Sequence, residues 1–305
     1  MTPALLRRLL QLLPTLLLLV TLTFLMLHAA PGGPFDDERA LPAATRAAIE
    51  AQYRLDQPLW QQYQHYIGQL LRGDLGPSYQ YPDRSVADLI GAGLPLSALL
   101  GGLAMLLALV CGLLLGTLAA LKPHGARDHL LMLFAVTGLS IPNFVLAPLL
   151  ILLMAVTLQW LPAGGWSGDP SQLVLPVLAL ALPQIATIAR LTRAALLDVL
   201  QTPWIRTARA KGLSERQIIW RHALRPVMLP VISYLGPAAA GTLTGSVVIE
   251  QIFGLPGIGR YFVLAAMNRD YGVVLGVVLL YGVLIVVFNL LVDLLHAALD
   301  PRVRL

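Results

Sequence analysis

Residues 204–225 read WIRTARAKGLSERQIIWRHALR, and six of these 22 residues are Arg or Lys. The chain on either side of this stretch is almost entirely apolar. Six cationic side chains at the centre of a bilayer would cost roughly 15–20 kcal/mol, at about 2.5–3.5 kcal/mol each. The stretch must therefore lie outside lipid, and its surroundings predict a membrane protein that exposes it on one side.

The composition of the whole chain supports this. Of the 305 residues, 57% are hydrophobic and only 12% are charged, and the mean hydropathy is +0.74. Soluble domains carry roughly 25% charged residues, so an ordinary soluble protein is excluded. A net charge of +5 could suggest a nucleic-acid partner, but the distribution of the charges favours membrane topology, and we expect no nucleic acid. The single cysteine, Cys111, is expected to pack among apolar neighbours.

Six apolar stretches are long enough to span a bilayer, which takes about 20 residues. The first could instead be a secretory signal, but its apolar run is long and Pro31 would follow the cleavage point, which favours an uncleaved helix. We therefore predict an all-α polytopic protein with six transmembrane helices. The stretches are about 9–28, 96–121, 130–159, 173–195, 227–249 and 273–297.

Lys and Arg residues set the predicted orientation. With the N-terminus inside, 14 of the 21 fall in inner segments and 7 in outer ones. Cytoplasmic segments of membrane proteins carry the excess of positive charge. Both termini and the basic stretch are therefore predicted to be cytoplasmic.

Residues 31–94 form the one long polar region and are predicted to be extracytoplasmic. Apolar positions between Leu59 and Leu71 follow a helical spacing, with Asp56 as the expected N-cap and Gly73 as the stop. Pro42 is expected to open a preceding helix that reaches about Arg54.

The sequence also predicts a third helix in this region. Ser85 and Asp88 have the spacing of a capping box. The region could be a lid packed on its own membrane domain, a docking surface for an extracytoplasmic partner, or both.

The basic stretch is predicted to be an ordered helix–turn–helix, here called the elbow (residues 202–225). Thr202-Pro203 is a typical helix start and Lys211 a plausible end. Gly212 can adopt the left-handed backbone that ends a helix, and Ser214 with Gln217 predicts a capping box for the second helix. From the residues alone, such an elbow could rest on anionic lipid or present cationic anchors to a soluble partner.

The run WIRTARAKGLSERQIIWRHALRPVMLP resembles the EAA loop of the permease subunits of ABC importers, in the form of the peptide and nickel branch. The general pattern is E-A-A, three further residues and then Gly. Here Arg206-Thr207-Ala208 stands at the E-A-A positions, so only Ala208 and Gly212 match the pattern. The resemblance implies that this loop, within residues 196–226, contacts an ATPase subunit. The contact residues it implies are Arg206, Ala208, Arg209, Lys211, Gly212, Ser214, Glu215, Arg221 and His222.

The likeness covers nearly the whole chain and lies mostly in loops, where apolar composition does not produce it. The chain is similar to B-type permease subunits of oligopeptide importers. The motifs that carry the likeness are PGGPF at 31–35, YRLDQP at 53–58, GDLGPS at 73–78, WLPAGGW at 160–166, VIEQIFGLPGIG at 248–259, NRDY at 268–271 and LDPRVR at 299–304.

This resemblance implies a type I ABC importer permease fold in the bacterial inner membrane. It implies a first span within 1–30, an extracytoplasmic segment 31–94, a five-helix transmembrane domain 95–298 and a cytoplasmic tail 299–305. The implied partners are a second homologous permease, two cytoplasmic ATPases that bind ATP and Mg²⁺, a peptide-binding protein and a peptide substrate. Dipeptides, nickel complexes and modified peptides stay open as substrates.

The chain contains no G-x-x-x-x-G-K-[ST] sequence, so we expect no ATP, no metal and no catalytic residue on it. The glycines at 254, 257 and 259 are not followed by the final glycine of a dinucleotide-binding motif. They predict a tight turn instead. An autonomous channel or secondary transporter would place more ionisable residues deep in its spans. An intramembrane protease would need paired Asp, a Ser/His pair or HExxH within spans, and none is evident.

Ionisable and small residues near the helix ends are candidates for the pathway or its gate. Glu250 follows the fifth span, and Asp293 lies one turn after Asn289 in the sixth. Gly257 and Gly259 are included as part of a turn near the pathway mouth. Lining the pathway and pairing between helices both stay open for Glu250 and Asp293.

Several other residues are expected to act in helix packing. Arg190 and Arg193, at the inner end of the fourth span, are predicted to be interface anchors, with substrate contacts as the alternative. Prolines within spans predict kinks and small residues predict close helix contacts. These residues are Pro142, Pro148 and Pro183, and Gly102, Gly112 and Gly116.

Overall fold

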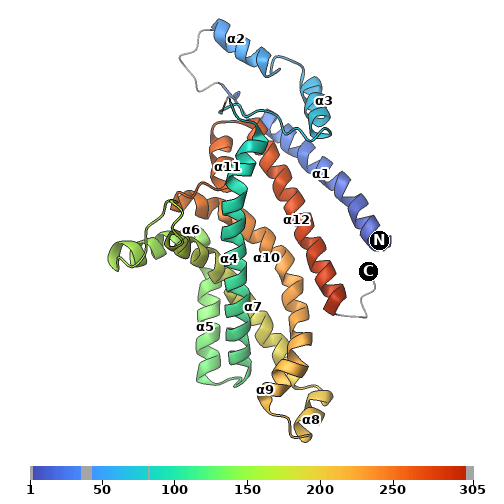
Figure 1. Ribbon diagram of the computed structural model, residues 1–305, viewed down its shortest axis with the longest axis vertical. Coiled ribbons are helices and arrows are strands. Elements are labelled where there is room, and N and C mark those ends of the chain that lie inside the picture. Colours follow the sequence, from blue (N-terminus) through green and yellow to red (C-terminus); the bar gives the residue numbers. More distant parts are fainter. Residues whose placement is uncertain (1–2, 36–42, 82, 300–305) are drawn as a thin grey trace.

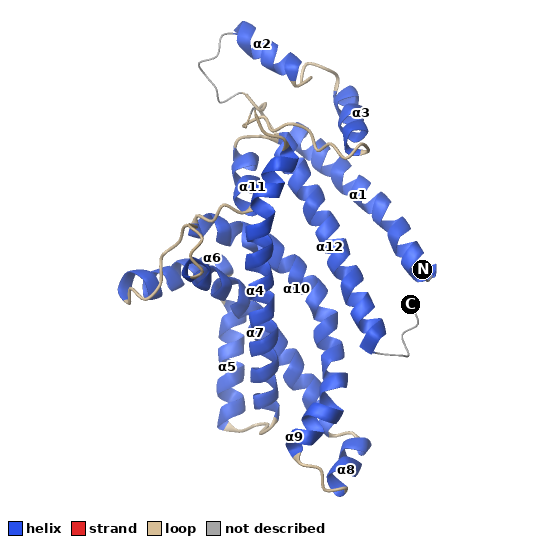
Figure 2. Cartoon of the chain, viewed as in Figure 1, coloured by secondary structure: helices blue, strands red, loops and turns tan. Residues whose placement is uncertain are grey.

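The computed structural model describes residues 3–35, 43–81 and 83–299. The regular secondary structure of this part is helical apart from one β-bridge between Pro77 and Ser85. Figure 2 shows helices joined by loops, without a sheet among the described residues. The helices are α1 Pro3–Ala29, α2 Ala43–Gln52, α3 Leu59–Leu70, α4 Val86–Ala120, α5 Ala126–Ser140, α6 Asn143–Leu150, the π-helix η1 Ile151–Thr157, α7 Ser171–Leu200, α8 Pro203–Ala210, α9 Glu215–Ile218, the π-helix η2 Ile219–Ala223, α10 Leu224–Phe253, α11 Ile258–Met267 and α12 Tyr271–Leu299.

Among the described residues, five helical stretches are long and apolar enough to cross a membrane, and a bent pair makes a sixth. The five contain α1, α4, α7, α10 and α12. The pair is α5 with α6–η1, bent by 106°. The six predicted stretches are therefore confirmed in position, and the all-α class with them.

The predicted span at 130–159 is broken rather than continuous, at the position where Pro142 predicted a kink. The chain breaks between α5 and α6, where Ile141 is extended (φ −91°, ψ 117°) and Pro142 precedes the new helix. A proline ring disfavours helical backbone in the residue before it, so Pro142 both ends α5 and redirects α6. In Figure 1, α6 runs across α4 and α5 rather than along them.

The centre of the bundle is the contact between α4 and α7. A Cβ atom added at Gly112 would lie 2.7 Å from Cβ of Ile188, and at Gly116 it would collide with the backbone oxygen of Ala189. The two glycines thus allow the close approach that the sequence predicted. Gly102 does not share this role, because nothing lies within 4 Å of its added Cβ.

Long helices of the bundle present apolar side chains outward. Leu130, Leu133 and Phe134 of α5 are 66%, 63% and 53% exposed. Such exposure is costly in water, but it is expected for helices that face lipid. Between α4, α10 and α12 a further apolar cleft of about 530 Å³ opens, and Gly102 lines it.

Beyond the ends of α1 and α12 lies a polar cap (residues 43–81), which carries α2 and α3 (Figure 1). The elbow, with α8 and α9, lies at the opposite end of the molecule. Asp270 fixes the cap to the start of α12: its carboxylate accepts hydrogen bonds from the Ser78 hydroxyl (2.5 Å) and from the backbone N–H groups of Tyr79 and Gln80 (both 3.1 Å).

The predicted ends of the cap helices are partly right. Arg54 and Gly73 both have left-handed backbone, φ +59° and +78°, just after α2 and α3. However, α3 begins after Pro58, not at Asp56, and Pro58 gives no side-chain cap. The predicted start of the preceding helix at Pro42 lies outside the described residues, as do residues 300–305 of the predicted tail.

Ser85 and Asp88 form the predicted capping box, but not for a separate third helix. The box opens α4, which continues through Pro95 to Ala120. The second span is therefore longer than the predicted 96–121. The apolar pattern marked only the lipid-length part of this helix, because its first turns lie at the polar cap.

Candidate functional site

The elbow has the predicted geometry. Thr202 takes the extended N-cap backbone before Pro203, although its hydroxyl bonds back to Val199 and does not cap α8. Gly212 follows α8 with φ +80°. Ser214 and Gln217 form both halves of the capping box at α9. The turn between the two helices is therefore fixed by backbone conformation and capping.

A small apolar core holds the two arms of the elbow together. Ile205 and Ala208 of α8 and Ile218 of α9 are buried, and Leu213 packs against them. Ala208, predicted to contact an ATPase, is only 6% exposed and faces this core. Its small side chain sets the spacing of α8 and α9.

Across the turn, Arg209 donates two hydrogen bonds to Glu215. The Nε–Oε1 and Nη2–Oε2 distances are 2.7 and 3.2 Å. Both side chains are exposed, so the pair adds about 1 kcal/mol or less to stability. The bidentate geometry instead fixes the orientation of both groups at the tip of the elbow.

Most of the remaining predicted contact residues lie on the surface of the elbow. Arg206, Lys211, Ser214 and Arg221 are exposed, and His222 is half-buried. Two large aromatic side chains lie among them, Trp204 (43% exposed) and Trp220 (66% exposed). Arg and Trp are enriched at protein interfaces relative to the rest of the surface.

The second arm of the elbow is continuous with a membrane-spanning helix. α9 passes through the π-helix η2 directly into α10, with helical backbone at each junction. At its base, Ala223 and Val227 pack against Ala120 of α4 and Leu196 of α7. The elbow is therefore joined to α10 without an intervening loop.

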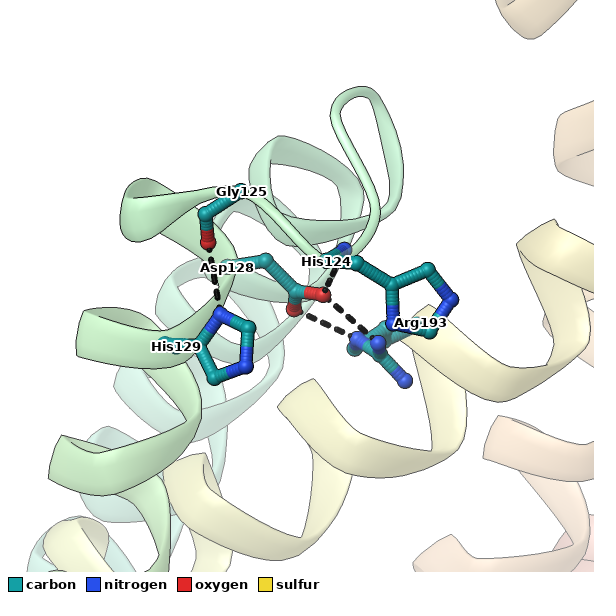
Figure 3. A network of polar contacts seen from close by, with 5 residues as sticks. All are labelled: His124, Gly125, Asp128, His129 and Arg193. Atoms are coloured by element: carbon teal, nitrogen blue, oxygen red, sulfur yellow. Dashed lines mark hydrogen bonds and ion pairs between the residues drawn. The ribbon is translucent and has the colours of Figure 1, made fainter.

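Near the elbow end of the bundle, an ion pair joins α5 to α7 (Figure 3). Asp128 Oδ1 and Oδ2 accept hydrogen bonds from Nε and Nη2 of Arg193, both at 2.6 Å, and Oδ2 also accepts from the backbone N–H of His124 at 2.9 Å. Asp128 is 3% exposed. Arg193 thus links α7 to α5 through a partner that the sequence analysis missed, and its role as an interface anchor stays a prediction.

No local signal could have found that partner. Asp128 and Arg193 are 65 positions apart, on different helices. Arg190, predicted to have the same anchoring role, is exposed and no contact with Asp128 is found.

At the other end of α10, Glu250 lies in a buried junction with α4 and α11. Its Oε1 accepts a hydrogen bond from the Ser97 hydroxyl and its Oε2 one from the Gly259 N–H, both at 2.7 Å. The Ser97 hydroxyl in turn accepts from the Ile258 N–H at 2.9 Å. Glu250 is fully buried.

The glycines of this junction are required by close packing. A Cβ atom at Gly257 would collide with the Glu250 carboxylate, and one at Gly259 with the backbone of Val247. Gly254, with φ +65°, ends α10. The predicted tight turn is confirmed, and within this chain Glu250, Gly257 and Gly259 form a helix junction.

Asn289 and Asp293 do not join this junction. Both lie in the later part of α12, where Asn289 is exposed and Asp293 is half-buried. The Asn289 side chain lies close to α10, because a Cβ atom at Gly236 would be 2.7 Å from its Oδ1. The five pathway candidates therefore fall into two groups along the bundle. The described residues hold no group of three or more His, Cys, Asp or Glu side chains that could bind a metal ion.

Comparison with known proteins agrees with this arrangement. The profile of the family described as "Binding-protein-dependent transport system inner membrane component" matches residues 112–305, which include the elbow. The chain belongs to this family.

Relatives within this family match over almost the full length. The oligopeptide transport system permease protein OppB of Salmonella typhimurium is 52% identical over 300 residues, covering 98% of both chains. The dipeptide transport system permease protein DppB of Bacillus subtilis is 46% identical over 291 residues, covering 95% of this chain and 94% of the relative. The resemblance to the peptide branch of these permeases is therefore confirmed.

Solved structures of more distant transporters share the fold. A chain of the inward-facing MetNI methionine ABC transporter aligns with a TM-score of 0.57 at 18% identity, over 70% of this chain and 96% of that chain. A chain of an amino acid ABC transporter aligns with a TM-score of 0.54, also at 18% identity, over 70% and 94%. The predicted type I permease fold is confirmed.

Proposed function

We propose that this permease forms half of the transmembrane pathway of an ATP-driven importer of oligopeptides. The observation that carries the proposal is the near full-length similarity to oligopeptide permease proteins, which extends through the polar loops. Dipeptides, nickel complexes and modified peptides are alternative cargoes for the same architecture. The second permease in the pathway would be a homologue of this chain.

Energy for transport is proposed to come from two separate ATPase subunits, which hold ATP and Mg²⁺. The sequence contains no P-loop, and no residue of this chain is assigned a catalytic role. A peptide-binding protein would deliver the substrate on the side of the cap. In this proposal both termini and the elbow would be cytoplasmic, and the cap would lie outside the inner membrane.

The elbow is proposed to transmit the movement of the ATPases. Its exposed Arg206, Lys211 and Arg221 would contact acidic groups of an ATPase, flanked by Trp204 and Trp220. When the ATPases close, α9–η2–α10 would move as one rod, and the helices would rock between inward-open and outward-open arrangements. The buried ion pair of Asp128 with Arg193 would keep α5 attached to α7 during this movement.

The first experiment is a pull-down of the tagged chain from its native membrane in mild detergent. We expect P-loop ATPases and a second six-span permease to be recovered with it. Recovery of the chain alone, stable and monodisperse, would favour an autonomous transporter with the elbow on lipid. Uptake of labelled dipeptides and longer peptides in cells that lack and then regain the chain would identify the cargo.

A further inference from the structure

A polar cavity lies between the cap and the ends of α1 and α12. Its volume is about 290 Å³, and its walls come from α1, α3, α12 and the segments that follow α2 and α3. Small-molecule sites usually measure about 300–1,000 Å³, so this cavity matches a ligand smaller than a typical drug. Neither the elbow nor the Glu250 junction contributes to it.

One wall carries a buried hydroxyl without a partner. Tyr66 of α3 is 9% exposed, and its Oη has no hydrogen-bond partner among the described residues. Burial raises the pKa of Tyr66 to about 12, so the hydroxyl keeps its proton and can donate. A buried polar group without a partner is rare in folded proteins and indicates a missing water or ligand.

Two histidines and an arginine add further donors. Nη1 of Arg54 donates to Nδ1 of His65 at 3.0 Å, so the ring proton of His65 is on Nε2, which becomes a donor. Both ring nitrogens of His28 face oxygen acceptors, Phe24 O at 2.9 Å and Gln62 Oε1 at 3.2 Å. His28 is thereby held against the backbone of its own helix and the side chain of α3.

None of the described residues that line the cavity is Asp or Glu. Near the lining residues in the chain, Asp74 accepts from the Gly76 N–H and Asp270 from the turn at residues 78–80. Glu50 and Asp56 flank Arg54 in the sequence but are not part of the lining. The lining therefore offers hydrogen-bond donors and the positive charge of Arg54, which complement an anion.

Aromatic rings form much of the remaining wall. Tyr53 and Tyr79 meet edge to face with ring centroids 4.8 Å apart, and Tyr79 lies 6.3 Å from Tyr271. Inorganic phosphate would leave such rings without contacts. A carboxylate attached to an organic body uses both the donors and the rings.

We propose that this cavity binds a small organic carboxylate of amino-acid to dipeptide size, held by Arg54, His65 and the hydroxyl of Tyr66. The site lies on the cap and is separate from the transmembrane pathway. Binding needs no ATP and no movement of the helices. It can therefore be tested whether or not the chain proves to transport peptides.

The test is a calorimetric titration of the full chain in lipid nanodiscs, with whatever subunits accompany it but without a binding protein. The probes are the dipeptide Ala-Phe and its C-terminal amide, which has the same body without the carboxylate. We expect saturable binding of the acid and at least about tenfold weaker binding of the amide, the loss expected for a hydrogen-bonded charge. Equal binding of the two probes, or binding of neither, would overturn the proposal.

Variants then locate the site. Tyr66→Phe and Arg54→Gln should each weaken Ala-Phe binding about tenfold, while Arg72→Gln, which changes an exposed arginine of the cap outside the cavity, should leave it unchanged. Thermal unfolding checks that each variant is folded. Unchanged binding in both cavity variants would place the ligand elsewhere and refute the assignment. Displacement of Ala-Phe by equimolar inorganic phosphate would refute the choice of a carboxylate.

Discussion

At the scale of single residues, the backbone of Gly212 is the feature most directly open to test. Its φ of +80° places it in the left-handed region, and nothing lies within 4 Å of an added Cβ. A substitution there would meet backbone strain and no steric clash, and the strain costs about 1–2 kcal/mol for a residue with a side chain. The turn of the elbow is therefore sensitive to the conformation of one residue.

We expect Gly212→Val to abolish most substrate uptake while the chain stays in the membrane, because the turn between α8 and α9 would change. Uptake and membrane abundance are measured side by side. Gly68→Val is the matched control, since Gly68 lies inside α3 with open space around it and without a positive φ. Full uptake by the Gly212→Val chain would show that the left-handed turn is not needed.

Asp128 and Arg193 give a second prediction at this scale. Arg193→Gln leaves a buried carboxylate without its charge partner, which should destabilise the protein by about 3–5 kcal/mol. The double variant with Asp128→Asn and Arg193→Gln should lose less stability than the sum of the losses in the two single variants. Thermal unfolding in detergent measures this, with the exposed Arg190→Gln as control. If the Arg193→Gln variant unfolds at the same temperature as the Arg190→Gln variant, the ion pair of Asp128 with Arg193 does not contribute to stability.

At the scale of elements, the junction of α4, α10 and α11 depends on the hydroxyl of Ser97. This group donates to Glu250 and accepts from the Ile258 N–H. Three helices are thus joined through one side chain.

Ser97→Ala would remove the hydrogen bond to Oε1 of the buried Glu250, which keeps the one from the Gly259 N–H, and would take from the Ile258 N–H its hydroxyl partner. A buried polar group that loses its partner costs about 1–3 kcal/mol. We expect a lower unfolding temperature and faster proteolysis near residues 254–259. Ser140→Ala is the control, because Ser140 is exposed in α5 and its hydroxyl donates to the Val136 carbonyl of the same helix. Equal stability of the two variants would mean that water replaces the lost hydroxyl without cost.

Elements also show where sequence patterns stop being informative. Pro142 predicted a kink, but the direction of α6 after the break depends on its packing against α7 and α10, which no local pattern encodes. The capping box at Ser85 was read correctly, yet its helix proved to be the start of a span. Hydropathy identifies the part of a helix that spans the lipid, but it does not predict the polar turns that extend beyond the lipid.

At the scale of the whole molecule, the cap and the elbow lie at opposite ends, and the charge distribution predicts which end is cytoplasmic. Cys111 is the one cysteine in the sequence, so Cys111→Ala gives a cysteine-free background. In this background, Arg72→Cys in the cap should react with a membrane-impermeant maleimide in spheroplasts. Lys211→Cys in the elbow should react only after the membrane is permeabilised.

Both positions are exposed, so unequal labelling of the intact membrane reports sidedness and not burial. Labelling after solubilisation provides the control for reactivity. The reverse pattern would invert the proposed topology and remove the elbow from the ATPases.

The sequence alone determined the helical class, the six apolar stretches, the turn at Gly212 and the caps at Ser85 and Ser214. These are local properties: hydrophobic length, the backbone freedom of glycine and hydrogen bonds within a few residues. The resemblance carried by the loops added the family.

Only the tertiary structure decided which distant residues meet. It paired Asp128 with Arg193, joined Ser97 to Glu250 and placed Arg54 beside His65 within the cap. It also turned Ala208 toward the core of the elbow, where the sequence suggested an exposed contact. Such contacts depend on how helices pack, and packing depends on shape complementarity between surfaces that are remote in sequence.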